Sequence, residues 1–311
     1  MSSSALKPLA GGHGPKKTIF ELIADPRASQ HLPSLSSVLR ELEDLAGRNN
    51  VMIQEISRLI RSDQSLAVRI LRLANSAYFA PAEPILDVDQ ALIYLGLSHV
   101  RTTIFTTRCI EQTCNISSDL LPWKEFWLHE VAVGFITRIL SQHMEERSLT
   151  PESYYIMGLF HDIGKLALAY LAPDDFTMVL TQARERHCDT SQVEFELLGI
   201  DHATLGAWYL QQQGLPAMVF EPIRLHHAWK IEGRQATLSC LLCLADKIAH
   251  RFGLGTSGSF VEAGGDMFAW EEWQQYEKRC DHKSEAEVER HRGIIQTELS
   301  HVPDLIHQIV T

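Results

Sequence analysis

The stretch "GLFHDIGKLAL", Gly158 to Leu168, places three polar residues within an apolar run: His161, Asp162 and Lys165. Its apolar residues recur at helical spacing, which predicts that the stretch lies inside a helix from about Tyr154 to Tyr170. A carboxylate in such surroundings must be paired, because an unpaired charge is costly to bury. The stretch therefore predicts either a metal site or a hydrogen-bonded polar cluster in the core.

Apolar residues follow the same helical spacing along most of the chain. Between Leu35 and Leu45 they recur every three or four residues, and Ser34 is a candidate N-cap for that helix. No segment alternates apolar and polar residues as a half-buried strand would, so we predict an all-α fold. Further helices are expected at Ile53–Ile60, Leu66–Leu73, Val88–Leu95, Val100–Ile110, Glu125–Leu140, Phe176–Arg186, Val193–Gln211, Met218–His227 and Gln235–Arg251.

Proline and glycine mark the breaks between these helices. The segment "APAEPILD", Ala80 to Asp87, is expected to be a loop, and Thr150 with Pro151 is expected to begin a helix. After Phe252 the sequence becomes glycine-rich, and two peripheral helices are expected beyond it, at "AWEEWQQYEKRC" and "SEAEVERHRGIIQTEL". Trp270 and Trp273 lie about one helical turn apart, which favours docking of the first of these helices on the core.

Composition excludes several classes of function. The formal charge of −11 argues against nucleic acid as the main partner, because phosphate binding needs clustered Lys and Arg. No apolar run approaches the roughly 20 residues that cross a bilayer, so no membrane segment is expected. The first 17 residues, "MSSSALKPLAGGHGPKK", lack the apolar core of a signal peptide. We therefore expect a flexible tail there and a cytoplasmic protein.

Five of the predicted helices carry an imidazole, a carboxylate or both. Such a set suits a first-row divalent metal (Fe, Mn, Ni or Zn), and a carboxylate such as Asp162 can bridge two ions. The alternative is that the histidines only form hydrogen bonds in the core. Gly206, one turn after His202, leaves room for a close approach between helices. The candidate ligands are Glu125, His129, His161, Asp162, His202, His226, His227 and Asp246.

Lys165 follows Asp162 by three residues and lies on the same helical face. It can hold a substrate phosphate as a point charge, or it can pair with Asp162, and the sequence leaves both roles open. Asp162 and Lys165 are thus the candidate catalytic residues. No GxSxG elbow, P-loop or GxGxxG segment supports nucleophilic or nucleotide-dependent chemistry.

Taken together and in order, several segments resemble the HDOD domain family, a relative of the HD and HD-GYP metal-dependent phosphohydrolases. The resemblance covers about residues 18–253, and "LRLANSA" is its most distinctive segment. The segments are "LPSL", "SDQSLAVRILRLANSAYF", "QALIYLGLSHVR", "FWLHEVAVG", "GLFHDIGKLAL", "GIDHATLGAWYL", "GLPAMVFEPIRLHH" and "LADKIA".

The resemblance implies an HD-like helical bundle with an additional N-terminal helical subdomain. Its expected divisions are a tail over 1–17, an N-terminal half over 18–118, an HD-like half over 119–253, and a loop with peripheral helices over 254–311. It also implies a regulatory role in bacterial signal transduction. The expected partners are an unidentified signalling protein and a phosphate-containing small ligand.

The metal-binding pattern of the HD-GYP relatives matches this sequence residue by residue. His161 and Asp162 match the HD pair, and the other candidate ligands match the remaining positions in type. The resemblance therefore implies a metal site, with two ions as the expected number. The alternative function is that of an active phosphohydrolase acting on a nucleotide or another phosphate ester.

One departure from the HD-GYP pattern concerns the substrate. The relatives carry an acidic residue after the paired histidines and then a Gly-Tyr-Pro loop. Here the sequence reads "HHAWKIEGRQ", with Ala228 at the acidic position. This argues against hydrolysis of cyclic di-GMP.

Overall fold

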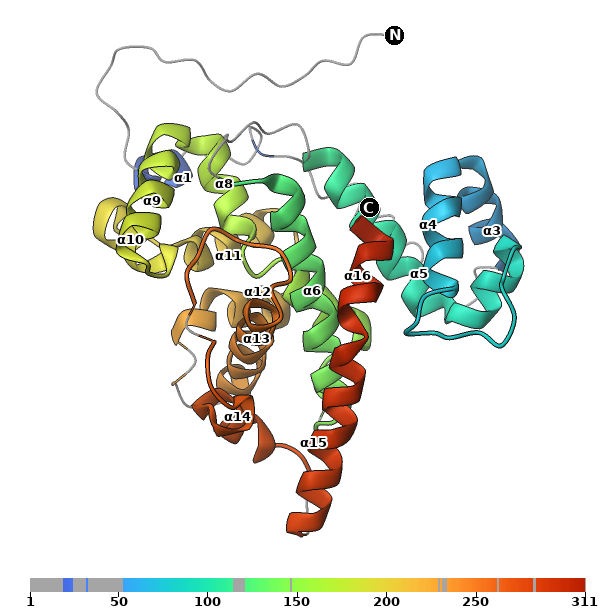
Figure 1. Ribbon diagram of the computed structural model, residues 1–311. Coiled ribbons are helices and arrows are strands. Elements are labelled where there is room, and N and C mark those ends of the chain that lie inside the picture. The colour runs from blue at the N-terminus through green and yellow to red at the C-terminus, as the bar shows by residue number, and fades with distance from the viewer. Residues whose placement is uncertain are drawn as a thin grey trace, which may run out of the picture.

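The computed structural model describes residues 19–24, 32, 53–113, 121–145, 147–228, 230, 234–261, 263–281 and 284–310. Every regular element in these ranges is a helix, which confirms the all-α prediction (Figure 1). None of those helices is long and apolar enough to cross a membrane. The expected tail over 1–17 and the helix expected at Leu35–Leu45, with its Ser34 cap, lie outside these ranges.

A small lobe stands to one side of the main bundle in Figure 1. It consists of α3 (Ile53–Ser62), α4 (Gln64–Ala74) and the first part of α5 (Val88–Thr113), which pack on one another. Helix α5 is kinked at Gly96, whose φ of 75° is a conformation that glycine adopts without steric cost. The kink separates the two helical segments that the sequence predicted, and the part beyond it packs against α7.

The "LRLANSA" segment ends α4 and fixes the loop that follows. Asn75 caps the helix, and its side-chain amide donates to the carbonyl oxygens of Leu71 and Ile85. Its oxygen also accepts from the Ile85 amide at 2.8 Å. Leu73 and Ala74 are buried. The distinctive residues of this segment thus stabilise the lobe itself.

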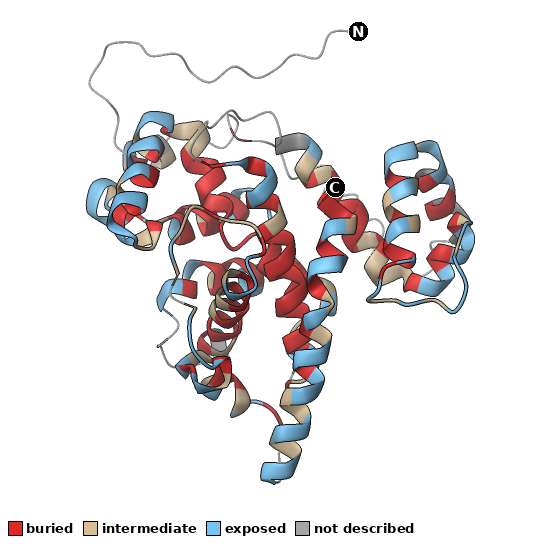
Figure 2. Cartoon of the chain, viewed as in Figure 1, coloured by how far each residue is buried: buried red, intermediate tan, exposed pale blue. Residues whose placement is uncertain are grey.

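Helix α6 (Trp123–Gln142) is the centre of the bundle. It packs against α7 (Pro151–Leu159), α13 (Arg234–Arg251) and the C-terminal helix α16 (Val302–Val310). Its residues are buried on nearly every side, as the continuous red along this helix in Figure 2 shows. Thr150 and Pro151 begin α7 as expected, and the Thr150 hydroxyl accepts from the Ser153 amide.

The HD pair lies in a turn between two helices, so the prediction of one helix from Tyr154 to Tyr170 is wrong. Helix α7 ends at Leu159 and α8 (Ile163–Leu171) begins after Asp162. Apolar spacing could not reveal this break, because the turn residue Phe160 is as buried as its helical neighbours. The turn directs the side chains of His161 and Asp162 into the bundle.

A second break divides the helix expected over Val193–Gln211. Helix α10 (Thr190–Leu198) ends at Gly199, whose φ is 72°, and α11 (His202–Gln212) begins after Asp201. The Asp201 carboxylate caps α11 by accepting from the Thr204 amide. Helix α9 (Pro173–Arg186) precedes them, and α12 (Ala217–Arg224) follows with the short helix η2 (His226–Ala228). A short helix, α1 (Ile19–Ala24), lies near the start of the chain.

The C-terminal region packs on the bundle. Trp270 and Trp273 are buried beside η3 (Met267–Ala269) and α14 (Glu271–Glu277), as their spacing predicted. Helix α15 (Glu285–Ser300) leads into α16, a helix that the sequence reading did not anticipate. Figure 1 shows α16 beside α6, and it also contacts α4 and α5. The end of the chain therefore joins the lobe to the bundle.

Helices α8 and α11 approach closely through two glycines, Gly164 and Gly206. A Cβ atom at Gly164 would overlap the carbonyl oxygen of His202, and one at Gly206 would lie 3.0 Å from the Gly164 nitrogen. The close approach between helices that was expected at Gly206 is therefore present. This close approach brings the start of α11 beside Asp162.

Substitution of Gly164 by alanine should separate α8 from α11. We expect Gly164→Ala to lower the free energy of unfolding by about 2 kcal/mol or more, since the overlap is with backbone atoms. The matched control is Gly293→Ala in exposed α15, where a Cβ atom meets nothing within 4 Å. There alanine should stabilise by up to about 1 kcal/mol. Urea unfolding measures both, and equal shifts in the same direction would contradict this prediction.

Candidate metal centre

Asp162 lies at the centre of a buried cluster of histidines. Its Oδ1 atom is 2.8 Å from Nε2 of His202, 3.6 Å from Nε2 of His161 and 3.8 Å from Nε2 of His226. These residues come from the α7–α8 turn, from α11 and from η2. His227 extends the cluster toward the surface, with its Nε2 atom 2.9 Å from that of His202. Segments far apart in the sequence thus meet at one carboxylate.

Asp246, on α13, is a second carboxylate in the same cluster. Its Oδ1 atom lies 2.9 Å from Nε2 of His129, 3.6 Å from Nε2 of His161 and 3.4 Å from Nε2 of His250. His161 is therefore equally distant from an oxygen of Asp162 and an oxygen of Asp246. The two carboxylates therefore approach the same ring nitrogen of His161.

The outer nitrogens of four histidines are fixed by hydrogen-bond acceptors. Nδ1 of His161 donates to the carbonyl oxygen of Gly158, and Nδ1 of His226 to that of Ile223. Nδ1 of His129 donates to the carbonyl oxygen of Leu254, and Nδ1 of His202 donates to Oε2 of Glu194. Carbonyl and carboxylate oxygens only accept, so each Nδ1 carries the proton. A neutral ring in this tautomer presents the Nε2 lone pair to the cluster.

Several buried polar atoms in this region have no hydrogen-bond partner among the described residues. They include Nε2 of His161, His226 and His250, and both carboxylate oxygens of Glu130. Buried polar groups are normally satisfied, so such a concentration indicates a ligand or ordered water. Glu130 is fully buried, and its Oε2 atom lies 3.4 Å from Nδ1 of His161.

The donor set and its spacing fit a transition metal. The donor atoms form three groups whose members lie within 4.8 Å of one another: Asp162, His202, His226 and His227; His129, Glu130, His161 and Asp162; and His129, Asp246 and His250. Two ligands bound at about 2.1 Å to one ion lie about 3.0–3.4 Å apart. The nitrogen–oxygen distances in the cluster fall around this range. The residues present therefore fit a metal, and Asp162 belongs to two of the groups.

Charges within the cluster keep its carboxylates ionised. Burial alone would raise the pKa of Asp162, but His161, Lys165 and His202 outweigh it and hold that pKa well below its usual range. His250 and His129 act in the same way on Asp246, whose pKa is also well below its usual range. Burial works against protonation of His202, but Glu194 and Asp162 raise its pKa to about 10. Against the effect of burial, Asp162 and Asp246 also raise the pKa of His161 well above its usual range, so the cluster pairs ionised carboxylates with rings that bind protons where a metal ion would otherwise bind.

Lys165 is buried and pairs with Asp162. Its Nζ atom lies 2.6 Å from Oδ2 of Asp162, 3.1 Å from Ser257 Oγ and 3.0 Å from Ser259 Oγ. These three acceptors match the three protons of an ammonium group. Of the two roles that the sequence left open, the geometry shows the pairing with Asp162.

The glycine-rich segment after α13 lies over the cluster. Leu254 supplies the carbonyl that anchors His129, and Ser257 and Ser259 bind Lys165. A Cβ atom at Gly255, whose φ is 72°, would overlap the carbonyl oxygen of Glu125. Glycine is therefore needed where this segment meets α6.

Seven of the eight candidate ligands lie in or beside the cluster, and Glu125 does not. Its side chain is exposed, and its backbone carbonyl accepts from the Thr256 amide. Sequence reasoning missed three residues of the site: Glu130, Glu194 and His250. His250 follows Asp246 by one helical turn and Glu130 is adjacent to His129, so their spacing was a usable signal.

Comparison with known proteins identifies the family of this chain. Residues 32–229, more than half of the chain, match the sequence profile of the HDOD domain family. The chain therefore belongs to the HDOD family. An uncharacterized protein of Treponema pallidum (strain Nichols) is 26% identical over 199 residues. That match covers 63% of this chain and 37% of the Treponema protein, so the chain spans little more than a third of its relative.

Two solved structures share the architecture. An HDOD domain protein of unknown function from Geobacter sulfurreducens superimposes with a TM-score of 0.71 at 23% identity, covering 88% of this chain and 93% of that one. A Shewanella amazonensis protein, provisionally named a phosphohydrolase, gives a TM-score of 0.65 at 20% identity, with coverages of 93% and 98%. At these identities the likeness establishes the fold.

The role of the hydrogen bonds from His202 to Glu194 can be tested by measuring metal affinity. Glu194 is fully buried and accepts from both the backbone nitrogen and Nδ1 of His202, each at 2.6 Å. We expect Glu194→Gln to weaken Mn²⁺ or Zn²⁺ binding about tenfold to a hundredfold, because a neutral amide oxygen accepts from these donors more weakly than the carboxylate does. Glu196→Gln on the same helix, where the carboxylate pairs with Arg186 in solvent, is the control. Competition with a chelating dye measures both affinities, and equal values would contradict the anchoring role.

Proposed function

We propose that this chain is a regulatory HDOD protein of bacterial signal transduction whose HD-like half holds one or two divalent metal ions. The observation that carries the proposal is the fixing of four histidines by acceptors at Nδ1, with each Nε2 directed at Asp162 or Asp246. Imidazole nitrogen with carboxylate oxygen suits Fe, Mn, Ni or Zn. The proposed ligands are His129, His161, Asp162, His202, His226, His227 and Asp246.

The alternative to a metal site is a cluster whose histidines and carboxylates are joined only by hydrogen bonds. Protonation of His202 would account for its 2.8 Å contact with Asp162 and its donation to Glu194. It would not account for Nε2 of His226, which has no hydrogen-bond partner among the described residues. Burial and neighbouring histidines hold the pKa of His226 well below its usual range, so this ring stays neutral. A neutral, buried Nε2 lone pair beside a carboxylate favours a metal over a proton network.

The enclosure of the cluster supports a regulatory rather than a catalytic role. His129, His161, His202 and His226 are almost completely buried, whereas the side chain of His227 is 25% exposed. Lys165, the candidate phosphate-binding residue, is occupied by Asp162 and two serines. A signalling protein partner is part of this proposal.

Metal-dependent phosphohydrolysis is the second candidate function. Asp162 belongs to two donor groups, so its carboxylate would be a ligand shared by the two ions of a hydrolytic site. A metal bound there would act as a Lewis acid on a phosphate ester. Lys165 would hold Asp162 in place, and His227 would form the solvent side of the site. The provisional name of the Shewanella protein agrees with this candidate, and Ala228 argues against cyclic di-GMP as the substrate.

Metal content is the direct test of the site. We expect purified protein to contain one or two equivalents of a first-row metal by elemental analysis, and His161→Ala and Asp162→Ala to lose most of it. His143→Ala is the matched control, since His143 pairs with Glu298 outside the cluster. Circular dichroism shows whether the variants fold. Metal-free wild-type protein that takes up no Mn²⁺, Fe²⁺, Ni²⁺ or Zn²⁺ would refute the metal site.

A substrate screen separates the two candidate functions. Wild-type protein reconstituted with Mn²⁺ is assayed with aryl phosphates, nucleotides and cyclic nucleotides beside Asp162→Asn. A regulatory module predicts no turnover above the uncatalysed background in either protein. Turnover that Asp162→Asn reduces at least a hundredfold would establish the hydrolase instead. Equal turnover in both proteins would place the activity outside this cluster.

A further inference from the structure

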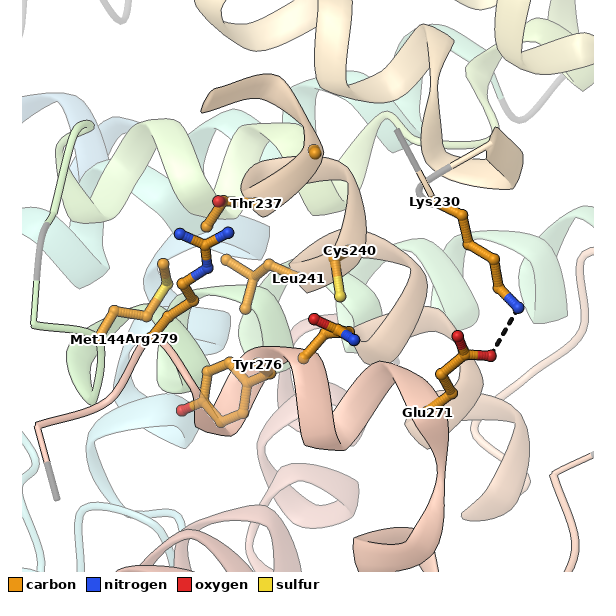
Figure 3. A pocket seen from close by; sticks show the side chains of 10 residues that line it. Met144, Lys230, Thr237, Cys240, Leu241, Glu271, Tyr276 and Arg279 are labelled. Carbon is orange, nitrogen blue, oxygen red and sulfur yellow. Dashed lines mark hydrogen bonds and ion pairs between the residues drawn. The ribbon is translucent and has the colours of Figure 1, made fainter. Parts of the chain in front are cut away.

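Two adjoining cavities lie beside α13, on the part of that helix that precedes Asp246. The first, of about 240 Å³, lies between α13 and α14 (Figure 3). The second, of about 490 Å³, lies beside it along the segment that follows α6. Met144, Thr237 and Arg279 line both cavities, so the two adjoin, and together they are called the groove. None of the groove residues belongs to the metal cluster.

The first cavity is mainly apolar. Met144, Leu241 and Tyr276 are buried, and they form its walls together with Ala236 and Cys240. The ion pair between Lys230 and Glu271, 2.6 Å long, lies on one side, and Arg279 lies on the opposite side next to Thr237 (Figure 3). Such a cavity suits an apolar or heteroaromatic group.

The second cavity is cationic. Arg147, Lys278 and Arg279 line it, with the hydroxyls of Ser148 and Thr237, and Glu145 is its one acidic side chain. Among the residues that the structure describes, none forms an ion pair or hydrogen bond with the guanidinium of Arg147 or of Arg279. The chain as a whole carries a formal charge of −11. A local excess of cationic side chains on such a protein indicates an anion-binding site.

We propose that this groove binds a small phosphorylated ligand with an apolar or heteroaromatic body. Arg147, Lys278 and Arg279 bind the phosphate, because guanidinium groups match the geometry of phosphate oxygens. The body of the ligand fills the cavity between α13 and α14. The site is separate from the metal cluster, although both lie on α13.

Calorimetric titration of the full chain tests the groove, with ADP, adenosine and inorganic pyrophosphate as probes. Metal is removed first with a chelator, so that phosphate groups have no ion to bind. We expect saturable binding of ADP, weaker binding of pyrophosphate and the weakest binding of adenosine. An absence of saturable binding for both ADP and pyrophosphate would overturn the proposal. So would ADP binding that appears only in metal-loaded protein, since the ligand would then be at the cluster.

Three variants separate the groove from general charge attraction. Arg279→Ala should weaken ADP binding about tenfold or more, as expected for loss of a charge-assisted hydrogen bond. Arg290→Ala removes the same charge from exposed α15 and should have no effect beyond twofold, whereas an equal loss would overturn the proposal. Ala236→Leu fills the apolar cavity and should weaken ADP more than pyrophosphate. Equal effects of that variant on the two probes would refute the assignment of the ligand body.

Discussion

A carboxylate buried at the turn between two apolar helices is the constraint on which this structure depends. Asp162 is 2% exposed, and an isolated charge at such a position would cost several kcal/mol. Lys165 neutralises it on one side, and His161, His202 and His226 surround it on the other. The surrounding helices must therefore deliver these side chains to one point, and the packing of the bundle follows from that requirement.

Close backbone approach makes this convergence possible. Gly164 allows α8 to contact the first turn of α11, which places His202 beside Asp162. Gly255 allows the segment after α13 to lie against α6, which places the Leu254 carbonyl on His129. Each glycine has a role in positioning a histidine. The geometry of the candidate metal centre is thus built from backbone contacts as much as from its donor atoms.

Helix α13 connects two regions with different chemistry. Its second half carries Asp246 and His250 in the cluster, and its first half lines the groove through Thr237, Cys240 and Leu241. One region is buried and carries two ionised carboxylates, whereas the other is open and has an excess of cations. The proposed ligand at one end of α13 and the proposed metal at the other would act on the same helix.

Much of the helical fold was predictable because apolar periodicity records which face of a helix is buried. The apolar residues of Phe126 to Leu140 and of Leu241 to Ile248 recur at helical spacing within one segment. The two helices are therefore where the sequence predicts them. The break at Phe160 was not predictable in this way, since a buried turn residue in an apolar run looks like a buried helical residue. Helix α16 was missed for a different reason: Val302, Leu305, Ile306 and Ile309 do follow helical spacing, but the segment is short, and its partners α4, α5 and α6 lie more than 150 residues away in the sequence.

The sequence by itself determined the residue types of the candidate site: histidines and carboxylates placed in apolar helices, where a metal or a polar network must satisfy them. Only the tertiary structure decided which members meet. It excludes Glu125 from the cluster by leaving its side chain exposed, and it adds Glu130, Glu194 and His250. The physical reason is that convergence depends on rotation about each helix axis and on distances between helices. Contacts between distant segments fix both of these, and spacing along one helix does not contain them.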